Sequence, residues 1–372
     1  MDKPRIIISG GGTGGHIFPA LSIANSIKEI CPDAEILFVG AIGKMEMEKV
    51  PAAGYPIKGL PVAGLQRKLS LSNLALPFKI IKSISIAGRI IKDFKPDVAV
   101  GVGGYASAPL LWSASHRSIP CLIQEQNSFA GLTNKILGKR VSKICVAYDG
   151  MEKFFPKEKI IFTGNPIRKE IAPPTQEQKV EGYKFYNLDP GKKTVFIVGG
   201  SLGSRTLNNT MIKWVKEKSK NAQYQVIWQS GKYYRQEVES FLKDKELPNL
   251  RNYDFIQRMD LAFAVADVIV SRAGAGTISE LCATGKATIF VPSPNVAEDH
   301  QTHNAMALVE KNAAMIVKDI DAEQTLMDKV EFLISDEVKI KEMETNILKL
   351  GKKNAGEIIA REVLSLIRKE YE

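Results

Sequence analysis

The sequence has few cysteines and no long apolar run. Its four cysteines, Cys31, Cys121, Cys145 and Cys282, are scattered, and none belongs to a CxxC pair. This spacing is typical of small buried thiols in a reduced protein and argues against a redox or metal role. No run of about 18 apolar residues occurs, and the first residues, MDKPRIII, lack a long signal-peptide core. We therefore expect a cytosolic protein that is neither secreted nor membrane-spanning.

Two nucleotide-binding motifs are also missing. No GxxxxGK[ST] sequence occurs, which argues against P-loop phosphate chemistry. Gly10-x-Gly12-x-x-Gly15 matches the dinucleotide fingerprint, but NAD binding also needs an acidic residue at the end of the second strand. That strand, AEILFVG, ends in Val39-Gly40 and carries its only acid, Glu35, at its start. The pattern disfavours NAD.

The composition is that of an ordinary globular protein, with 44% hydrophobic and 25% charged residues. At 372 residues the chain exceeds a comfortable single core, so we expect two domains. The net charge of +10 favours anionic partners such as nucleic acid, anionic lipid or phosphorylated substrates. The sequence shows no recognition helix or aromatic platform, so we do not expect nucleic acid as a partner.

Two glycine-rich stretches organise the chain. In Arg5–Pro19, RIIISGGGTGGHIFP, a β-branched run leads into a glycine turn and then into a helix that we expect to end at Ile30. Thr194–Asn208, TVFIVGGSLGSRTLN, repeats this order. Glycines let another molecule approach the backbone, and the N-terminus of the following helix favours an anion. Two such turns suggest two similar α/β halves that face one cleft.

Strand-like segments alternate with helical ones, which predicts doubly wound parallel sheets. The expected strands of the first half are Arg5–Ser9, Glu35–Val39, Asp97–Val102, Pro120–Gln124, Lys143–Val146 and Ile160–Thr163; those of the second half are Thr194–Val198, Tyr224–Gln229, Leu250–Phe255, Val268–Ser271, Ala287–Val291 and Ala314–Val317. Gly164-Asn165-Pro166 interrupts the alternation. We therefore expect domains at 1–165 and 166–350, followed by a segment, 351–372, whose helix returns to the first domain.

Polar or glycine-rich residues follow three strands of the first half. His16 comes directly after the first glycine turn, a second turn runs from Gly101 to Tyr105, and Gln124–Asn127 follows the strand at 120–124. Open α/β sheets bind their ligands at these carboxyl ends of strands. The ordinary pKa of histidine suits a general base near neutral pH, although a histidine at a helix start also forms structural hydrogen bonds with loops.

The second half carries a third turn of small residues. Ser271–Glu280, SRAGAGTISE, is expected to run from a strand into a helix, so that its backbone N–H groups meet a diphosphate. Glu280, one turn into that helix, could accept hydrogen bonds from two ribose hydroxyls, or could simply be a solvated acid favoured by the helix dipole. Gln301 begins the next helix and could reach sugar hydroxyls.

Two patterns resemble metal sites but do not predict one. His300 and His303 are spaced i, i+3, yet no third ligand is evident. Asp319-x-Asp321 resembles the DxD motif of some sugar transferases, but Gln324 follows Asp321 by three residues. We interpret this as a capping box with Asp321 as the N-cap. We expect neither a metal nor another cofactor.

One segment, Leu65–Lys95, departs from the alternation. Its aliphatic residues are interspersed with seven basic residues and a single acid, Asp93. This pattern fits a core helix with a solvated basic face, or an apolar patch that rests on an anionic membrane surface. Pro77 is expected to bound or kink the helix.

Seven motifs, taken in order, resemble those of the MurG family, the bacterial family 28 glycosyltransferases of peptidoglycan synthesis. They are GGGTGGHIFPA at 10–20, GVGGYASAP at 101–109, QEQNSFAGLTNK at 124–135, GNPIR at 164–168, GGSLGSRTLN at 199–208, SRAGAGTISEL at 271–281 and EDHQTHNA at 298–305. The resemblance implies the two-domain GT-B fold, with an acceptor- and membrane-associating first domain and a second domain that binds UDP-N-acetylglucosamine (UDP-GlcNAc). It also implies inverting, metal-independent transfer of GlcNAc to the 4-hydroxyl of the muramyl pentapeptide of lipid I. The expected location is the cytoplasmic face of the inner membrane, with other cell-wall synthesis proteins as further partners.

The same resemblance assigns residues to roles. His16 becomes the candidate general base, with Glu125 as the runner-up. Gly103, Gly104 and Tyr105 fall on the acceptor side. Asn127 contacts either the donor sugar or the acceptor. The other implied donor contacts are Thr13, Gly14, Gly15, Arg168 and Ser201 for the sugar and diphosphate, Ile256, Ala275, Gly276, Thr277, Ser279 and Glu280 for the nucleotide, and Gln301 for the sugar. Leu202 and Gln124 depart from the family's usual Gln and His, so no side-chain role is expected at either position.

Other classes of protein share parts of this pattern. A UDP-GlcNAc 2-epimerase has the same architecture and donor, but the basic apolar segment and the QEQN sequence argue against it. A diacylglycerol glycosyltransferase is disfavoured by GGSLG and GNPIR, and a non-catalytic nucleotide-sugar sensor by the presence of both His16 and Glu125.

Overall fold

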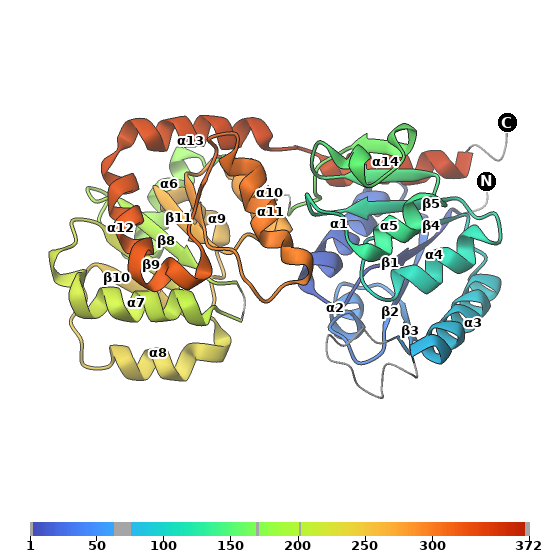
Figure 1. Ribbon diagram of the computed structural model, residues 1–372, viewed down its shortest axis with the longest axis horizontal. Coiled ribbons are helices and arrows are strands. Elements are labelled where there is room, and N and C mark those ends of the chain that lie inside the picture. The colour runs from blue at the N-terminus through green and yellow to red at the C-terminus, as the bar shows by residue number, and fades with distance from the viewer. Residues whose placement is uncertain (1–2, 63–75, 169–170, 201, 369–372) are drawn as a thin grey trace. The chain divides into compact units, whose positions relative to one another are not determined.

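The computed structural model describes residues 3–62, 76–168, 171–200 and 202–368. The backbone forms two compact units, of which unit 1 comprises residues 1–167 and 352–372 and unit 2 comprises residues 168–351. Each unit is built on one parallel β-sheet with helices on both faces (Figure 1). This is the doubly wound α/β class that the alternation of strands and helices predicts.

Unit 1 has a seven-stranded sheet in the order β3-β2-β1-β4-β5-β6-β7. Its strands are β1 (Arg5–Ser9), β2 (Glu35–Ala41), β3 (Ile57–Leu60), β4 (Val98–Gly101), β5 (Cys121–Glu125), β6 (Lys143–Val146) and β7 (Ile160–Phe162). Its helices are α1 (Gly14–Ile30), α2 (Glu46–Ala52), α3 (Leu76–Phe94), α4 (Ser107–Ser115), α5 (Leu132–Gly138) and α14 (Ala355–Arg368).

Alternate residues of β1 belong to two separate hydrophobic clusters, because successive side chains of a strand point to opposite faces of the sheet. Ile7 packs with residues of α3, α4 and α5 on one face, whereas Ile6 and Ile8 pack with α1 and α14 on the other. All three isoleucines are completely buried. A strand that is covered on both faces reads as a continuous apolar run, which is why RIIIS shows no alternation of polar and apolar residues.

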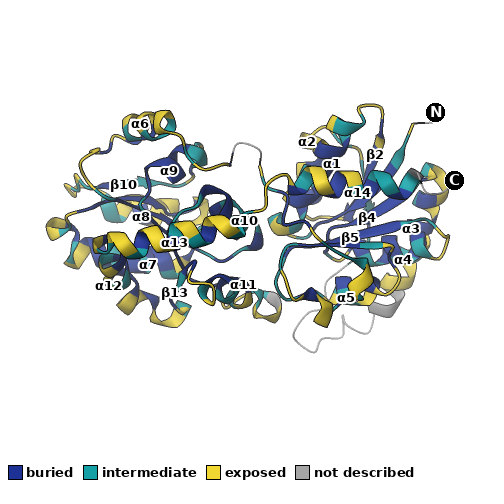
Figure 2. Ribbon diagram, turned by 90° about the horizontal axis from the view of Figure 1, so that it is seen from above, coloured by how far each residue is buried: buried dark blue, intermediate teal, exposed yellow. Residues whose placement is uncertain are grey.

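Unit 2 has a six-stranded sheet in the order β10-β9-β8-β11-β12-β13. Its strands are β8 (Thr194–Val198), β9 (Gln225–Gln229), β10 (Leu250–Tyr253), β11 (Val268–Ser271), β12 (Thr288–Phe290) and β13 (Met315–Ile316). Its helices are α6 (Gln176–Phe185), α7 (Arg205–Glu217), α8 (Arg235–Leu242), α9 (Met259–Val265), α10 (Ala275–Thr284), α11 (His300–Val309), α12 (Ala322–Ser335) and α13 (Glu337–Leu350). Figure 2 shows buried strands in each unit between helices with exposed outer faces.

The same pair of hydrogen bonds, made by an aspartate, occurs at the start of both sheets. In unit 1, Asp97 Oδ2 accepts from the backbone N–H of Arg5 at 2.7 Å, and the Asp97 N–H donates to the Arg5 carbonyl at 2.8 Å. In unit 2, Asp267 Oδ2 accepts from the Thr194 N–H at 2.7 Å, and the Asp267 N–H returns to the Thr194 carbonyl at 2.8 Å. Each aspartate precedes the strand that pairs with the first strand of its unit, so the halves are alike in detail as well as in topology.

Several expected boundaries differ from the structure. The strand β3 is missing from the sequence-based prediction, because IKGL contains a lysine and a glycine and buries only Leu60 completely. α3 begins at Leu76, next to Pro77, and the earlier part of the basic segment lies outside the described residues. Among the described residues, no helix is long and apolar enough to cross a membrane.

The helix α14 completes the core of unit 1 against α1. Ile359, Ala360 and Val363 are fully buried there, and Glu362 and Ser365 both accept from Lys143 Nζ. At Gly356 a side chain would lie 2.8 Å from Ser26 Oγ, so the glycine permits close approach of the two helices. Unit 1 therefore draws part of its core from residues that follow unit 2 in the chain.

We expect Val363→Asp to destabilise unit 1 strongly, because the new carboxylate would be buried without a partner. Uncompensated buried charges cost about 3–5 kcal/mol. The fall in the free energy of unfolding can be measured by urea denaturation followed by limited proteolysis. Ile358→Asp is the matched control, since Ile358 lies on the same helix and is 39% exposed. Equal loss of stability in both variants would contradict this account of the α14 interface.

Candidate active site

The first glycine turn holds His16 at the start of α1. Thr13 is the N-cap residue but makes no side-chain cap, so the backbone N–H groups of the first turn are not capped by its hydroxyl. The Nδ1 atom of His16 lies 3.1 Å from the Gly11 carbonyl oxygen and 3.3 Å from Thr13 Oγ1. Because a carbonyl oxygen only accepts, this contact assigns the proton to Nδ1 and leaves the ring lone pair on Nε2. That is the tautomer a general base at Nε2 requires.

The second glycine turn, at Gly103-Gly104, packs directly against the first. A side chain on Gly103 would lie 2.9 Å from His16 Nε2, and one on Gly104 would lie 2.3 Å from the Gly11 carbonyl oxygen. Gly104 also has φ +87°, where a side chain is strained. The structure thus brings His16 and the Gly103–Gly104 turn together at the ends of β1 and β4. Tyr105, the next residue, is 50% exposed.

Glu125, at the end of β5, is buried and fully hydrogen-bonded. Its Oε1 accepts from the Asn127 backbone N–H at 3.0 Å and from Asn127 Nδ2 at 3.2 Å. Its Oε2 accepts from the Gly131 N–H at 3.0 Å and from Asn134 Nδ2 at 2.9 Å. Burial raises the pKa of Glu125, and these four donors act in the opposite direction. The geometry suits a residue that orders the 126–131 loop.

Asn127 therefore has its amide nitrogen directed at Glu125. The neighbouring Gln124 and Gln126 are buried and belong to a polar cluster with Asn165, whose Oδ1 accepts from Gln124 Nε2 at 2.8 Å. Asn165 Nδ2 in turn donates to the Gln126 carbonyl at 3.0 Å. The QEQN sequence thus fixes a loop at the end of β5 by side-chain hydrogen bonds that spacing alone does not reveal.

Glu46, which no sequence motif singles out, braces the first glycine turn. It belongs to the first turn of α2 and is 1% exposed. Its Oε2 accepts from the Gly12 N–H and its Oε1 from the Ala41 N–H, each at 2.9 Å. Side chains on Gly11 or Gly40 would collide with it, at 2.2 Å and 2.5 Å. The glycines beside Glu46 therefore make room for a buried carboxylate.

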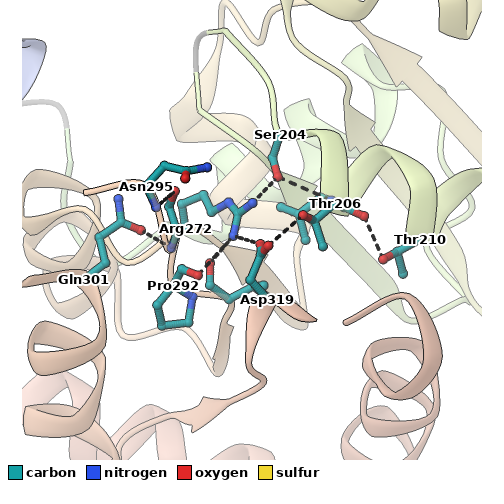
Figure 3. Close-up of polar contacts among 11 residues, drawn as sticks. Ser204, Thr206, Thr210, Arg272, Pro292, Asn295, Gln301 and Asp319 are labelled. Carbon is teal, nitrogen blue, oxygen red and sulfur yellow. Dashed lines mark hydrogen bonds and ion pairs between the residues drawn. The ribbon is translucent and has the colours of Figure 1, made fainter. Parts of the chain in front are cut away.

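In unit 2, Arg272 holds the turn that precedes α7. Its guanidinium donates to Ser204 Oγ, to Asp319 and to the carbonyl oxygens of Val291 and Pro292 (Figure 3). Ser204 is the N-cap of α7 and accepts from the Leu207 N–H at 3.3 Å. One arginine thus joins the 199–204 turn, the 291–293 loop and the segment after β13. Five donors in a rigid fork suit this task, and lysine has no equivalent geometry.

Asp319 also accepts from Thr206 Oγ1 at 2.9 Å, so the first carboxylate of the DxD pattern is part of this internal network. The expected capping box at Asp321 is wrong. Asp321 precedes α12, but its side chain makes no cap. Its backbone, at φ −93° and ψ −9°, is already helical because Asp319–Asp321 forms a 3₁₀ turn. An N-cap side chain reaches the helix from extended backbone, which Asp321 does not have.

The small-residue turn before α10 is open. Gly274 is the N-cap and offers no side-chain cap, and a side chain on Gly276 would meet nothing within 4 Å. Ala275, Gly276 and Thr277 begin the helix, and Ser279 Oγ donates back to the Ala275 carbonyl at 3.0 Å. The backbone N–H groups at this positive helix end are therefore available for an anion without displacement of a side-chain cap.

Arg168 and Glu280 form an ion pair in unit 2, with Arg168 Nε 2.9 Å from Glu280 Oε1. The arginine side chain is 54% exposed and the glutamate 18% exposed. The structure thus brings together two residues that were expected to bind adjacent parts of the same nucleotide sugar. The pair is a partly solvated salt bridge, of the kind that contributes little to stability and is easily exchanged for other partners.

Two further expected donor contacts, Ile256 and Gln301, lie in unit 2 after strands β10 and β12. Ile256 follows β10 and is 4% exposed. Gln301, in the first turn of α11, accepts from the Ser293 N–H through Oε1 at 2.8 Å (Figure 3). Gln229, at the end of β9, donates to the carbonyls of Gly200 and Asp254 and so ties the glycine turn to the loop before Ile256. Ser201 lies outside the described residues.

Neither metal-like pattern gains support from side-chain geometry. His300 and His303 both belong to α11. Within the described part of the chain, no cluster of three or more histidine, cysteine, aspartate or glutamate side chains could hold a metal ion.

Residues 6–146 match the glycosyltransferase family 28 N-terminal domain, and residues 194–360 match the glycosyltransferase family 28 C-terminal domain. A transferase of Phocaeicola vulgatus is 57% identical over 98% of this chain and 97% of its own length. It is named UDP-N-acetylglucosamine–N-acetylmuramyl-(pentapeptide) pyrophosphoryl-undecaprenol N-acetylglucosamine transferase, as is a Bacteroides thetaiotaomicron protein that is 55% identical over the full length of both chains. The crystal structure of Acinetobacter baumannii MurG aligns with a TM-score of 0.79 at 26% identity, covering 98% of this chain and 99% of that one.

The chain belongs to glycosyltransferase family 28. Its fold is GT-B, as the resemblance of the motifs implied. The N-terminal family 28 domain lies within unit 1, whereas the C-terminal one covers most of unit 2 and continues into α14 of unit 1. The identity to named N-acetylglucosamine transferases also identifies it as a hexosyltransferase of cell-wall precursor synthesis. The roles of individual residues in this family 28 enzyme remain predictions.

We expect Arg272→Lys to destabilise unit 2, because a lysine cannot bridge Ser204, Asp319 and two carbonyls at once. Hydrogen bonds to charged groups contribute about 1.5–3 kcal/mol each, so the loss of one or more should lower the thermal midpoint by several degrees. Differential scanning calorimetry would measure the change. Arg235→Lys is the control, since Arg235 is 59% exposed and pairs with Glu239 on the surface. A midpoint that falls equally in both variants would contradict the bridging role.

Proposed function

We propose that this chain transfers GlcNAc from UDP-GlcNAc to the 4-hydroxyl of the muramyl pentapeptide of lipid I, with inversion at the anomeric carbon. The observation that carries the proposal is identity of 55–57% over nearly the whole chain to proteins named for this transfer. The site geometry supports it, since unit 2 offers the N-terminus of α10, which has no side-chain cap, and a half-exposed arginine, Arg168. Unit 1 offers the His16 imidazole, whose Nδ1 contact with the Gly11 carbonyl leaves the lone pair on Nε2.

On the donor side, we propose that the Arg168–Glu280 ion pair opens when the nucleotide sugar binds. Glu280 would exchange the guanidinium for two ribose hydroxyls, and Arg168 would exchange the carboxylate for the diphosphate. Arg168 keeps an anionic partner and Glu280 keeps hydrogen-bond donors, which limits the cost of opening a partly exposed salt bridge. Ala275, Gly276 and Thr277 would present backbone N–H groups to the diphosphate, with Ser201 on the other turn. Gln301 would bind the sugar and Ile256 would pack beside the uracil.

On the acceptor side, His16 is the proposed general base, beside Gly103, Gly104 and Tyr105. The proton of the acceptor hydroxyl moves to His16 Nε2 as the hydroxyl oxygen attacks the anomeric carbon. The bond from that carbon to the diphosphate oxygen breaks, and UDP leaves with the bonding electrons. Arg168 and the N-termini of α7 and α10 would stabilise its charge, so we propose that the reaction needs no metal ion.

The decisive experiment measures transfer of radiolabelled GlcNAc from its UDP derivative to a soluble lipid I analogue in the presence of EDTA. We expect a β-1,4-linked disaccharide product, with a rate that EDTA leaves unchanged. Conversion of the donor to its 2-epimer without transfer would replace the proposal by that of an epimerase. Transfer that EDTA abolishes would retain the acceptor but overturn metal independence.

We expect His16→Ala to lower kcat about 10²–10⁴-fold, the usual contribution of a positioned base, without weakening the binding of UDP to unit 2. Initial rates and calorimetric titration with UDP would separate the two effects. His116→Ala is the control, because His116 is exposed and stacks on Trp112 at the end of α4. A kcat within a few-fold of the unsubstituted enzyme would remove His16 from the mechanism.

We also propose that unit 1 rests on an anionic membrane surface at the cytoplasmic face of the inner membrane. Ile80 and Ile81 on α3 are 46% and 65% exposed, and Leu132 and Ile136 on α5 are 61% and 54% exposed. Both helices cover the same face of the unit 1 sheet. Exposed Lys79 and Lys82 flank the α3 pair, and apolar side chains ringed by lysine favour the interface of an anionic bilayer.

We expect Ile81→Asp combined with Leu132→Asp to reduce binding to phosphatidylglycerol vesicles at low salt. Burying charge in the interface is unfavourable, and each new acid also opposes the anionic surface. Vesicle co-sedimentation would measure binding. Ile320→Asp combined with Val338→Asp is the control, since these unit 2 residues are 86% and 81% exposed. Unchanged sedimentation of the α3–α5 variant would refute this surface.

A further inference from the structure

The peptide group that joins Gly11 to Gly12 is hydrogen-bonded on both sides. Its N–H, on Gly12, donates to Glu46 Oε2 at 2.9 Å, and its carbonyl, on Gly11, lies 3.1 Å from His16 Nδ1. A trans peptide is planar and directs its N–H and C=O in opposite directions. The carboxylate of Glu46 and the imidazole of His16 are therefore joined through one rigid group.

Glu46 is itself held in a single position. It is 1% exposed, and its second oxygen accepts from the Ala41 N–H at the end of β2. Gly40 lies so close that a side chain there would be 2.5 Å from Glu46 Cγ. The carboxylate cannot turn away from Gly12 without losing a hydrogen bond and leaving a buried polar group unsatisfied. Glu46 is therefore not a solvated acid of the helix surface.

We propose that Glu46 is a positioning residue that acts on His16 through the Gly11–Gly12 peptide. The carboxylate polarises the Gly12 N–H, which makes the Gly11 carbonyl a stronger acceptor for His16 Nδ1–H, since hydrogen bonds in a chain strengthen one another. The relay holds the imidazole in the Nδ1–H tautomer and stabilises the imidazolium formed when Nε2 takes the acceptor proton. No proton passes along the relay, and Nδ1 keeps its proton. This inference rests on the proposed function, because it takes His16 as the base.

The first test is spectroscopic and needs no activity. Nitrogen-15 NMR of the histidine-labelled chain distinguishes the two imidazole tautomers, and His16→Ala assigns the His16 signals among the four histidines. We expect neutral His16 to carry its proton on Nδ1, and Glu46→Gln to weaken that preference. A proton on Nε2 in the unsubstituted chain would overturn the relay. This measurement decides even where Glu46→Gln does not fold.

The second test is kinetic and uses Glu46→Gln, which keeps the shape but removes the charge and one acceptor. We expect kcat to fall about 10- to 100-fold, the range for groups that orient a reacting side chain, with unchanged UDP affinity. Glu48→Gln, on the same helix but exposed and paired with Lys49, should behave like the unsubstituted enzyme. Equal kcat values for the Glu46 and Glu48 variants would overturn the proposal.

The double variant separates positioning from general stability. If Glu46 acts through His16, Glu46→Gln should cost nothing further in a His16→Ala background, because coupled residues are non-additive. A further loss of the same size in that background would make Glu46 merely structural and overturn the relay. If His16→Ala alone keeps full turnover, the proposed base fails, whereas the NMR result still reports on the relay.

Discussion

Turns made of glycine have no side chains with which to hold themselves in place, and this constraint governs both units. The backbone N–H groups that the turns present are useful only if the turns are rigid, so residues from elsewhere in the chain must brace them. In unit 1 the brace is Glu46, and Gly104 packs on the Gly11 carbonyl from the other side. In unit 2 the brace is Arg272, which reaches Ser204 beside the corresponding turn. The glycine sequences and their distant braces form one structural feature.

The charge of each bracing side chain, Glu46 or Arg272, affects which ligands its turn can bind. Glu46 occupies the Gly12 N–H with a carboxylate, so part of the anion-binding capacity of the first turn is satisfied within the protein. Arg272 braces the second turn through the Ser204 hydroxyl, with its charge paired to Asp319, and the N-terminus of α10 has no side-chain cap. The two units share the hydrogen bonds of Asp97 and Asp267 at the start of their sheets. They differ in the side chain that braces the glycine turn. In the proposed function, the turns of unit 2 bind the anion and the turn of unit 1 orients the base.

The sequence predicts the features of the fold that depend on local pattern. Arg5–Ser9, Lys143–Val146, Thr194–Val198 and Val268–Ser271 are strands with the expected bounds, because buried parallel strands are short continuous apolar runs. The glycine turns, His16 and the SRAGAG stretch were also found from local sequence. The role of Glu46 could not be predicted, because its hydrogen bond to Gly12 joins residues 34 positions apart that only the fold brings together. The Arg168–Glu280 pair is likewise separated by 112 residues, so each residue could be assigned to a ligand but not to the other. The predicted N-cap at Asp321 is wrong, because the 3₁₀ turn at Asp319–Asp321 gives Asp321 helical backbone angles instead of the extended ones that a cap needs.

The position of α14 has a consequence for synthesis on the ribosome. Chains emerge from the N-terminus, and domains generally fold as units when their residues become available. Here the apolar residues of α1 that pack against Ile359 and Val363 are translated before unit 2, whereas α14 is translated after it. Unit 2 is continuous in the chain and can complete its core while unit 1 still lacks a helix. The half of the enzyme that is made first is therefore the half that finishes folding last.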